Sequence, residues 1–150
     1  MRAGDIVPIE PVHAALLAGM HRVCFAEPWD KEAMGDLLAM PGAYGFLALP
    51  QAESGSLPLG FALCRVAADE AEILTILVLP PFRRSGLARE LLKQTLDKAR
   101  LAGSTAIFLE VAADNIGARS LYSSEGFEQV GKRPRYYGNA IDAFVMKKVL

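Results

Sequence analysis

Hydrophobic and polar positions follow two different spacings along this chain, and together they predict both strands and helices. Continuous or alternating apolar runs are typical of strands, and they cover residues 5–9, 44–49, 59–66, 71–78, 105–112, 127–132 and 141–149. Apolar residues spaced three to four apart are typical of helices, and they cover residues 11–23, 30–40, 86–102 and 115–126. Pro8 is expected at a strand end or on an edge strand, because proline cannot donate to a ladder.

Several helix boundaries are marked by residues with a capping preference. Asp30 and Asn115 are typical N-caps, because their side chains can accept hydrogen bonds from free backbone N–H groups. Gly103 is a typical stop for the long helix. The first helix is expected to bury one face, formed by Val12, Leu16, Met20 and Val23. The long helix is expected to bury a face formed by Leu87, Leu91, Thr95 and Ala99.

The middle of the chain predicts one β-α-β unit. Strand 71–78, helix 86–102 and strand 105–112 follow one another with short connections, as two parallel strands joined by a helix require. The strands before and after this unit are expected to form hairpins, the first around the polar loop 51–58. The predicted fold class is therefore mixed α/β.

Composition and charge narrow the class of protein. The chain has 150 residues, of which 52% are hydrophobic, and its formal net charge is −1. This size fits one domain over residues 1–150, and the high apolar share argues against disorder. Balanced charge gives no support to a nucleic-acid binder and leaves only a local basic patch open.

Neither a membrane segment nor a metal site is predicted. The longest uncharged stretch, residues 37–52, is interrupted by Pro41 and Pro50 and is shorter than a membrane-spanning helix. No signal peptide is recognisable, so we expect a cytoplasmic protein. Cys24 and Cys64 are expected to be reduced core thiols, and with two histidines the chain offers too few ligands for a metal.

The connection Arg83–Ala88 is the first candidate for chemistry. It joins a buried strand to the long helix, whose N-terminus offers free N–H groups and a partial positive charge. Gly86 lets an anion approach the backbone closely, and the neighbouring arginines add charge, so the segment suits a pyrophosphate. The motif is neither a P-loop nor a dinucleotide-binding glycine pattern. The alternative is an ordinary helix start with solvated arginines.

This Arg-x-x-Gly-x-Ala connection resembles the acetyl-CoA pyrophosphate loop of the GNAT N-acetyltransferase superfamily. Further motifs resemble its ribosomal-protein alanine N-acetyltransferase (RimI-like) branch, in order and over nearly the whole chain: Pro28-Trp29-Asp30, Leu109-Glu110-Val111, Asn115, Leu121-Tyr122, Gly126-Phe127, Arg133-x-x-Tyr136-Tyr137 and Asp142-Ala143-x-x-Met146. The resemblance implies a seven-stranded, mostly antiparallel sheet with one central parallel pair and flanking helices. It also implies acetyl-CoA as co-substrate and a protein N-terminus, in this branch that of a ribosomal protein, as acceptor.

The resemblance assigns cofactor-binding roles to two segments and a helix cap. In the strand, backbone N–H groups would hold the thioester carbonyl and the pantetheine arm, at Ile76, Leu77 and Val78. In the loop, the pyrophosphate would be held by Arg84, Ser85, Gly86, Leu87, Ala88 and Arg89. Asn115 would cap its helix and also bond the pantetheine arm. Without the resemblance, the strand segment reads as plain core.

Glu110 and Tyr122 are the candidate catalytic residues. Glu110 is the one charge in an apolar strand, and alternation alone favours a solvent-facing side chain. The resemblance instead implies a general base that takes a proton from the acceptor ammonium. Tyr122 lies in a short helix, where packing on the sheet is the usual role of a tyrosine. The resemblance implies that its hydroxyl protonates the departing thiolate.

On the acceptor side, Trp29, Tyr136 and Tyr137 are candidate wall residues, with loop packing as the alternative. Arg133 and Arg135 are interpreted as solvated charges, and both histidines as residues without a role. The function that these features imply is acetyl-CoA-dependent N-acetylation of a protein α-amino group by direct attack in a ternary complex. Three alternatives stay open: acetylation of a small-molecule amine, a non-catalytic acyl-CoA-binding module, and an RNA- or ribosome-docking protein.

Overall fold

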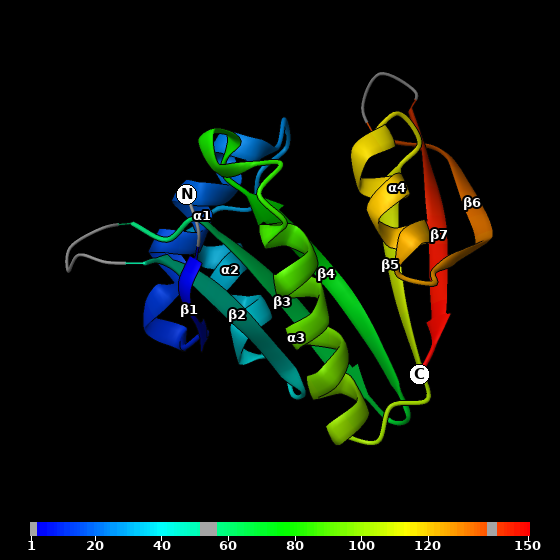
Figure 1. Cartoon of the computed structure of the whole chain (residues 1–150), viewed down its shortest axis with the longest axis horizontal. Coiled ribbons are helices and arrows are strands. Elements are labelled where there is room, and N and C mark those ends of the chain that lie inside the picture. Colours follow the sequence, from blue (N-terminus) through cyan, green and yellow to red (C-terminus); the bar gives the residue numbers. More distant parts are fainter. Residues whose placement is uncertain (1–2, 52–56, 138–140) are drawn as a thin grey trace.

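A seven-stranded sheet forms the centre of the protein (Figure 1), in a computed structural model that describes residues 3–51, 57–137 and 141–150. The strands are β1 (Ala3–Pro8), β2 (Ala43–Pro50), β3 (Gly60–Ala67), β4 (Glu70–Val78), β5 (Ala106–Ala112), β6 (Glu128–Tyr137) and β7 (Ile141–Val149). Their order is β1-β2-β3-β4-β5-β7-β6, and among these described strands only β4 and β5 pair in parallel. The predicted mixed α/β fold with one parallel pair is confirmed, and Pro8 lies on an edge strand as expected.

Helices cover both faces of this sheet: α1 (Ala14–Cys24), α2 (Lys31–Ala39), α3 (Leu87–Leu101) and α4 (Ile116–Ser124), with short 3-10 helices at Pro11–His13 and Pro80–Phe82. Side chains of β3 alternate between two cores. Ala62 and Cys64 pack in the core beneath α3 and α4, and Phe61 and Leu63 pack in the core beneath α1 and α2. We call these sides the α3/α4 face and the α1/α2 face. In the described part of the chain, no helix is long and apolar enough to cross a membrane.

The predicted helix caps and the buried face of the long helix are confirmed. Asp30 accepts a hydrogen bond from the backbone N–H of Ala33 at 2.8 Å. Asn115 accepts a hydrogen bond from the backbone N–H of Ala118 at 3.2 Å. Helix α3 buries the predicted residues and two more, namely Leu87, Leu91, Leu92, Thr95, Leu96 and Ala99.

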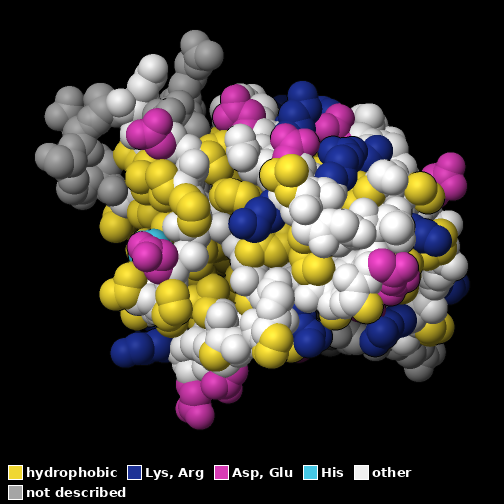
Figure 2. Space-filling model, turned by 90° about the horizontal axis from the view of Figure 1, so that it is seen from below, with side chains coloured by type: hydrophobic (Ala, Val, Ile, Leu, Met, Phe, Trp, Pro, Cys, Tyr) yellow, Lys and Arg dark blue, Asp and Glu magenta, His cyan; other side chains and the backbone are white. Residues whose placement is uncertain are grey.

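The predicted buried face of the first helix is correct at Met20, which is buried, and at Leu16, which is half-buried, but it is wrong at its two ends. Val12 and Val23 are 81% and 62% exposed, because residues 11–13 form a 3-10 helix and the α-helix begins only at Ala14. The buried positions follow the helical period from there: Ala14, Leu17, Ala18 and His21, with Met20 beside them. Hydrophobic side chains gather at the left of the face shown in Figure 2, the side on which α1 lies in Figure 1.

The two predicted core thiols differ in their burial. Cys64 is buried in the core, as predicted, whereas Cys24 is half-buried at the end of α1. Both cysteines are free.

Strands β4 and β5 run side by side over only part of their length. Their register ends at Ile73 opposite Leu109, although both strands continue for several residues. Just beyond this pair, Leu74 has no partner in the register of β4 with β3. Such a bulge bends its strand. The two strands therefore diverge toward the end of the sheet where α3 begins, at the top of Figure 1, and we call this divergence the split.

Candidate active site

Strand β4 has an open edge along the split. Beyond Ile73, none of the described strands pairs with it on its β5 side. This part contains the predicted backbone donors Ile76, Leu77 and Val78, of which the first is half-buried and the other two are buried. An unpaired strand edge presents backbone N–H and C=O groups that another molecule can bind. The predicted donors thus lie where a bound group would have access to the backbone.

The connection from β4 to α3 has the backbone geometry of an anion site. Arg84 and Gly86 have positive φ angles of 62° and 83°, and an alternation of this kind turns successive N–H groups toward a common point. No side chain caps α3, which starts immediately after Gly86, so its first N–H groups remain available. Ser85 donates its hydroxyl proton to the carbonyl of Phe82 at 2.7 Å. A Cβ built on Gly86 meets nothing within 4 Å, so open space lies where the pyrophosphate is predicted.

Two arginines of this connection are engaged within the protein. Arg83 donates from Nε to the carbonyl of Val78 at 2.9 Å, which fastens the loop to the end of β4. Arg89 forms an ion pair with Glu125 at 2.6 Å and a hydrogen bond with Ser124 at 3.1 Å. Arg89 thereby links α3 to the end of α4, and its predicted contact with the cofactor stays a prediction.

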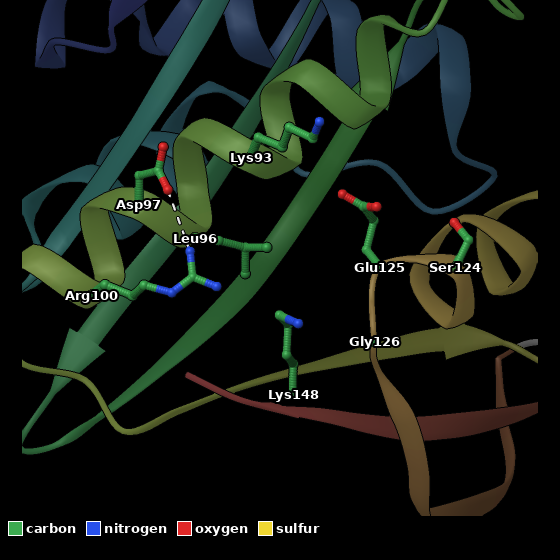
Figure 3. A pocket seen from close by; sticks show the side chains of 8 residues that line it. All are labelled: Lys93, Leu96, Asp97, Arg100, Ser124, Glu125, Gly126 and Lys148. Carbon is green, nitrogen blue, oxygen red and sulfur yellow. Dashed lines mark hydrogen bonds and ion pairs between the residues drawn. The ribbon is translucent and has the colours of Figure 1, made fainter.

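A polar cavity of about 480 Å³ lies on the α3/α4 face, between these two helices (Figure 3). Its lining comes from α3, the end of α4 and β7: Lys93, Leu96, Asp97, Arg100, Ser124, Glu125, Gly126 and Lys148. Arg100 pairs with Asp97 at 3.3 Å. The molecule is therefore hollowed on the α3/α4 face, with charged side chains of both signs around the hollow.

Glu110 lies at the point where the split begins. It is the first residue of β5 after the last parallel pair, and it faces the α1/α2 side because Leu109 and Val111 pack in the opposite core. Its side chain is 22% exposed, and its Oε1 lies 2.9 Å from Nε of Arg133. The guanidinium therefore places a positive charge directly against the Glu110 carboxylate. Arg133, interpreted as a solvated charge, is 58% exposed and in addition forms this ion pair, which links β6 to β5 and could not be predicted from the spacing of the two residues in the sequence.

Tyr122 lies on the other side of β5. It is 5% exposed in the core beneath α3 and α4, with its ring 5.7 Å from that of Phe127. The packing expected of a helical tyrosine is therefore present. Because Glu110 and Tyr122 approach β5 from opposite faces, a group held in the split would have the carboxylate on one side and the tyrosine on the other. This arrangement suits a base and an acid that act on different atoms.

A second carboxylate, Glu72, accompanies Glu110 and is absent from the predicted site residues. It lies opposite Phe108 in the register of β4 with β5, and Glu110 is the next residue of β5 on that face. Burial and the negative charge of Glu110 raise the pKa of Glu72, against the opposing charges of Arg65 and Arg133. Its sequence signal is the one that singled out Glu110, a lone charge inside a predicted buried strand.

A stack of three rings holds the segment between α1 and α2. His21 stacks on Phe25 and on Trp29, with ring centroids 4.2 Å and 4.7 Å away. The backbone N–H of Trp29 donates to Nδ1 of His21 at 3.1 Å. Trp29 is half-buried against the α1/α2 core, so this predicted acceptor-side residue lies on the same face as Glu110. His21, interpreted above as a residue without a functional role, holds this segment in place through its stacking and its hydrogen bond. The four-residue spacing of His21 and Phe25 is the feature of the sequence that could have predicted the stacking.

The other predicted wall residues, Tyr136 and Tyr137, end β6. Their side chains, like that of Arg135, lie outside the described residues, so their role stays a prediction. Among the residues that the structure describes, no group of three or more His, Cys, Asp or Glu side chains could hold a metal ion.

Acidification is expected to destabilise the protein through His21. Burial lowers the pKa of His21 from its ordinary value of 6.5, so the unfolded chain binds a proton more readily than the folded protein does. The free energy of unfolding should therefore fall as the pH drops through 6.5 and level off below the folded-state pKa. Chemical denaturation at several pH values between about 5 and 8 measures this slope.

A His21→Phe variant keeps an aromatic ring in the stack but cannot take up a proton, so this part of the pH dependence should disappear. The matched control is His13→Phe, at the other histidine of the chain, which should retain it. An unchanged slope in His21→Phe would assign the pH dependence to other groups.

The chain matches known proteins over most of its length. The model of the acetyltransferase (GNAT) family matches residues 15–127. The N-alpha-acetyltransferase RimI of Mycobacterium tuberculosis is 37% identical over 127 residues, which cover 81% of this chain and 76% of that protein. An uncharacterized protein of Mycobacterium leprae is 49% identical over 80 residues, 53% of this chain, but this match spans only 21% of that protein. The crystal structure of the ribosomal-protein-S18-alanine N-acetyltransferase from Escherichia coli has a TM-score of 0.86 at 28% identity, covering 97% of this chain and 92% of that one.

Proposed function

We propose that this chain, which belongs to the acetyltransferase (GNAT) family, transfers the acetyl group of acetyl-CoA to the N-terminal α-amino group of a protein. The observation that carries the proposal is the position of Glu110 at the split, where its carboxylate forms an ion pair with Arg133. The names of the relatives from M. tuberculosis and E. coli support an α-amine as acceptor. A ribosomal protein with an N-terminal alanine is the first candidate substrate, and such a substrate places the reaction in the cytoplasm.

Acetyl-CoA fits the groups that surround the start of α3. Positive φ at Arg84 and Gly86, an uncapped helix and open space at Gly86 suit a pyrophosphate. The open edge of β4 at residues 76–78 suits the polar groups of a pantetheine arm. When bound, acetyl-CoA supplies a thioester carbonyl that an amine can attack.

Residues on the two faces of β5 divide the proton transfers between them. On the α1/α2 face, Glu110 takes a proton from the acceptor ammonium, directly or through one water, which frees the nitrogen lone pair for attack. Backbone N–H groups on the open edge of β4 stabilise the negative charge that develops on the carbonyl oxygen. On the α3/α4 face, Tyr122 donates a proton to the departing thiolate as the carbon–sulfur bond breaks. The nitrogen loses its second proton to water as the amide forms, and Tyr122 regains its proton from water, so that one proton is released per turnover. Because both substrates meet in the split, the acetyl group passes directly between them.

An α-amine is an easier acceptor for this base than a lysine side chain. The pKa of a model α-amino group is about 7.7–8.0, compared with about 10.4 for lysine. A larger share of the α-amine is therefore unprotonated near neutral pH. A single carboxylate such as Glu110 is then a sufficient base.

Blocking one amine at a time tests the acceptor. A peptide with a free N-terminal alanine and an acetylated lysine should react roughly tenfold faster or more than the same peptide with a blocked N-terminus and a free lysine, because of this pKa difference. Release of free CoA thiol and mass spectrometry of the peptide measure both rates.

The alternative functions predict different results in the same assay. Equal rates on the two peptides would contradict the preference for α-amines and indicate a general amine acetylase. Turnover of polyamines or free amino acids but of neither peptide would indicate a small-molecule enzyme. Binding of acetyl-CoA in calorimetry without thiol release on any amine would indicate a non-catalytic acyl-CoA-binding module.

A further inference from the structure

Two carboxylates lie side by side on the α1/α2 face, at the end of the paired part of β4 and β5. Glu72 faces Phe108 across the parallel ladder, and Glu110 follows Phe108 on the same face of β5. Glu72 is exposed, and together with Arg65 and Phe108 it lines a cavity of about 250 Å³. Water therefore reaches Glu72 more easily than Glu110, whose side chain is 22% exposed.

Charged groups face this pair from every neighbouring strand: Arg65 on β3, Glu70 on β4, Arg133 on β6 and Lys147 on β7. Nζ of Lys147 lies 5.5 Å from the ring centroid of Phe108, between the strands that carry the pair and the ion-pairing arginine. Partial desolvation of its carboxyl group and the charge of Glu110 raise the pKa of Glu72, and the two arginines oppose this shift. Neighbouring carboxylates repel each other electrostatically, so removing the charge of one of them changes the electrostatic surroundings of the other.

We propose that Glu72 is a positioning residue for acetyl transfer that acts through Glu110. Its negative charge opposes the positive charge of Arg133 beside Glu110, the residue that takes the proton of the acceptor ammonium. The proton then leaves to water through the cavity beside Glu72, while the nitrogen lone pair forms the amide bond. The role in acetyl transfer rests on the proposed function, whereas the coupling of the two carboxylates does not.

Glu72→Gln is expected to change the pH–rate profile in two opposite ways. Without the second negative charge, Glu110 loses its proton at lower pH, so the acid limb of kcat moves down by about half a pH unit or more. The same change makes Glu110 a weaker base, so the plateau of kcat falls about two- to threefold. The variant is therefore slower at neutral pH and less inhibited at acid pH. A general loss of structure would lower kcat at every pH.

Two further variants distinguish an electrostatic effect on Glu110 from a loss of structure. Glu70→Gln is the matched control, because it removes an exposed carboxylate from the same face of β4, farther from Glu110. It should leave the acid limb in place. Arg133→Gln removes the opposing charge from Glu110, and it should move the acid limb to higher pH.

NMR titration of the carboxyl carbons, in the protein without substrates, tests the coupling independently of turnover. The Glu110 signal, assigned by its loss in Glu110→Gln, should titrate at lower pH in Glu72→Gln than in the wild type or in Glu70→Gln. Coincident titrations in these three proteins would overturn the inference, whatever the activity.

The rates and the titrations together distinguish the inference from the proposed function. Coupled titration with an unchanged pH–rate profile in Glu72→Gln would overturn the positioning role and leave the proposed function intact. Coupled titration without acetyl transfer to any amine would overturn the proposed function and, with it, the role of Glu72 in the reaction.

Discussion

Replacing Glu110 with Gln is expected to lower kcat by about 10²–10⁴-fold near neutral pH. Gln keeps the size of the side chain and an oxygen that can face Arg133, but it cannot take the proton. Arg133 is 58% exposed, so loss of the ion pair costs little stability. The rate should recover in part above a pH of about 8, where the α-amine loses its proton without a base. A pH–rate profile from about pH 6 to 10 with saturating peptide measures both effects.

Tyr122→Phe provides the comparison for this result. It should lower kcat less than Glu110→Gln does, because a thiolate is a tolerable leaving group without protonation. Its loss should show no recovery at high pH, since raising the pH supplies no proton to the thiolate. Acetyl-CoA affinity should change little in Glu110→Gln, whose altered side chain lies on the face away from α3 and α4. Wild-type rates in Glu110→Gln at every pH would leave the carboxylate with a structural role only, as the partner of Arg133.

Gly86→Glu is expected to weaken acetyl-CoA binding by about 30-fold or more, a free-energy difference of roughly 2 kcal/mol. Gly86 has a φ of 83°, and a Cβ there meets nothing within 4 Å. The new side chain therefore extends into the open space beside the first turn of α3. A carboxylate there repels a pyrophosphate, since two unit charges about 5 Å apart repel by roughly 3 kcal/mol at an effective dielectric constant of about 20. Titration calorimetry measures the affinity.

Gly86→Glu adds a charge and also strains a backbone with a positive φ, so these two effects on affinity must be distinguished. A glycine at the other end of α3 provides the control. Gly103 has a φ of 89°, and a Cβ built there also meets nothing within 4 Å. Gly103→Glu therefore introduces a comparable strain and the same charge far along the helix from the predicted pyrophosphate. Denaturation should show similar losses of stability in the two variants, with affinity reduced only in Gly86→Glu. Equal affinities would remove the support for this loop as the cofactor site.

Features that depend on chain neighbours could be predicted from the sequence. The caps at Asp30 and Asn115 form as predicted, because a cap needs only its own side chain and an N–H group three residues ahead. The buried face of α3 and the types of the strands follow in the same way from periodicity. The error in α1 shows the limit of this reasoning. Periodicity predicts the spacing of the residues on a buried face. The 3-10 helix at Pro11–His13, which has fewer residues per turn than an α-helix, shifts which residues of the segment point toward the core.

In the candidate site, too, some features are visible in the sequence and others depend on the tertiary structure. Glu110 is visible in the sequence as a lone charge in an apolar strand, and Gly86 as the glycine of a strand-to-helix connection. Glu72 carries the same signal as Glu110, but its significance depends on which strand lies beside β4. The catalytic and binding roles of these residues stay predictions, since they rest on the resemblance and on geometry that suits it.

By itself, the sequence determined which segments form strands and helices, which residues share a face in the strands and in α3, and which carboxylate is unusual for its surroundings. Only the tertiary structure decided which side chains meet: Arg133 reaches Glu110 across β7, and Glu72 lies beside Glu110 through the parallel register. The split likewise depends on one unpaired residue, Leu74, in the pairing of β4 with β3. The physical reason is that a strand's period of two specifies its faces, whereas its neighbours and register are set by contacts between residues far apart in the chain.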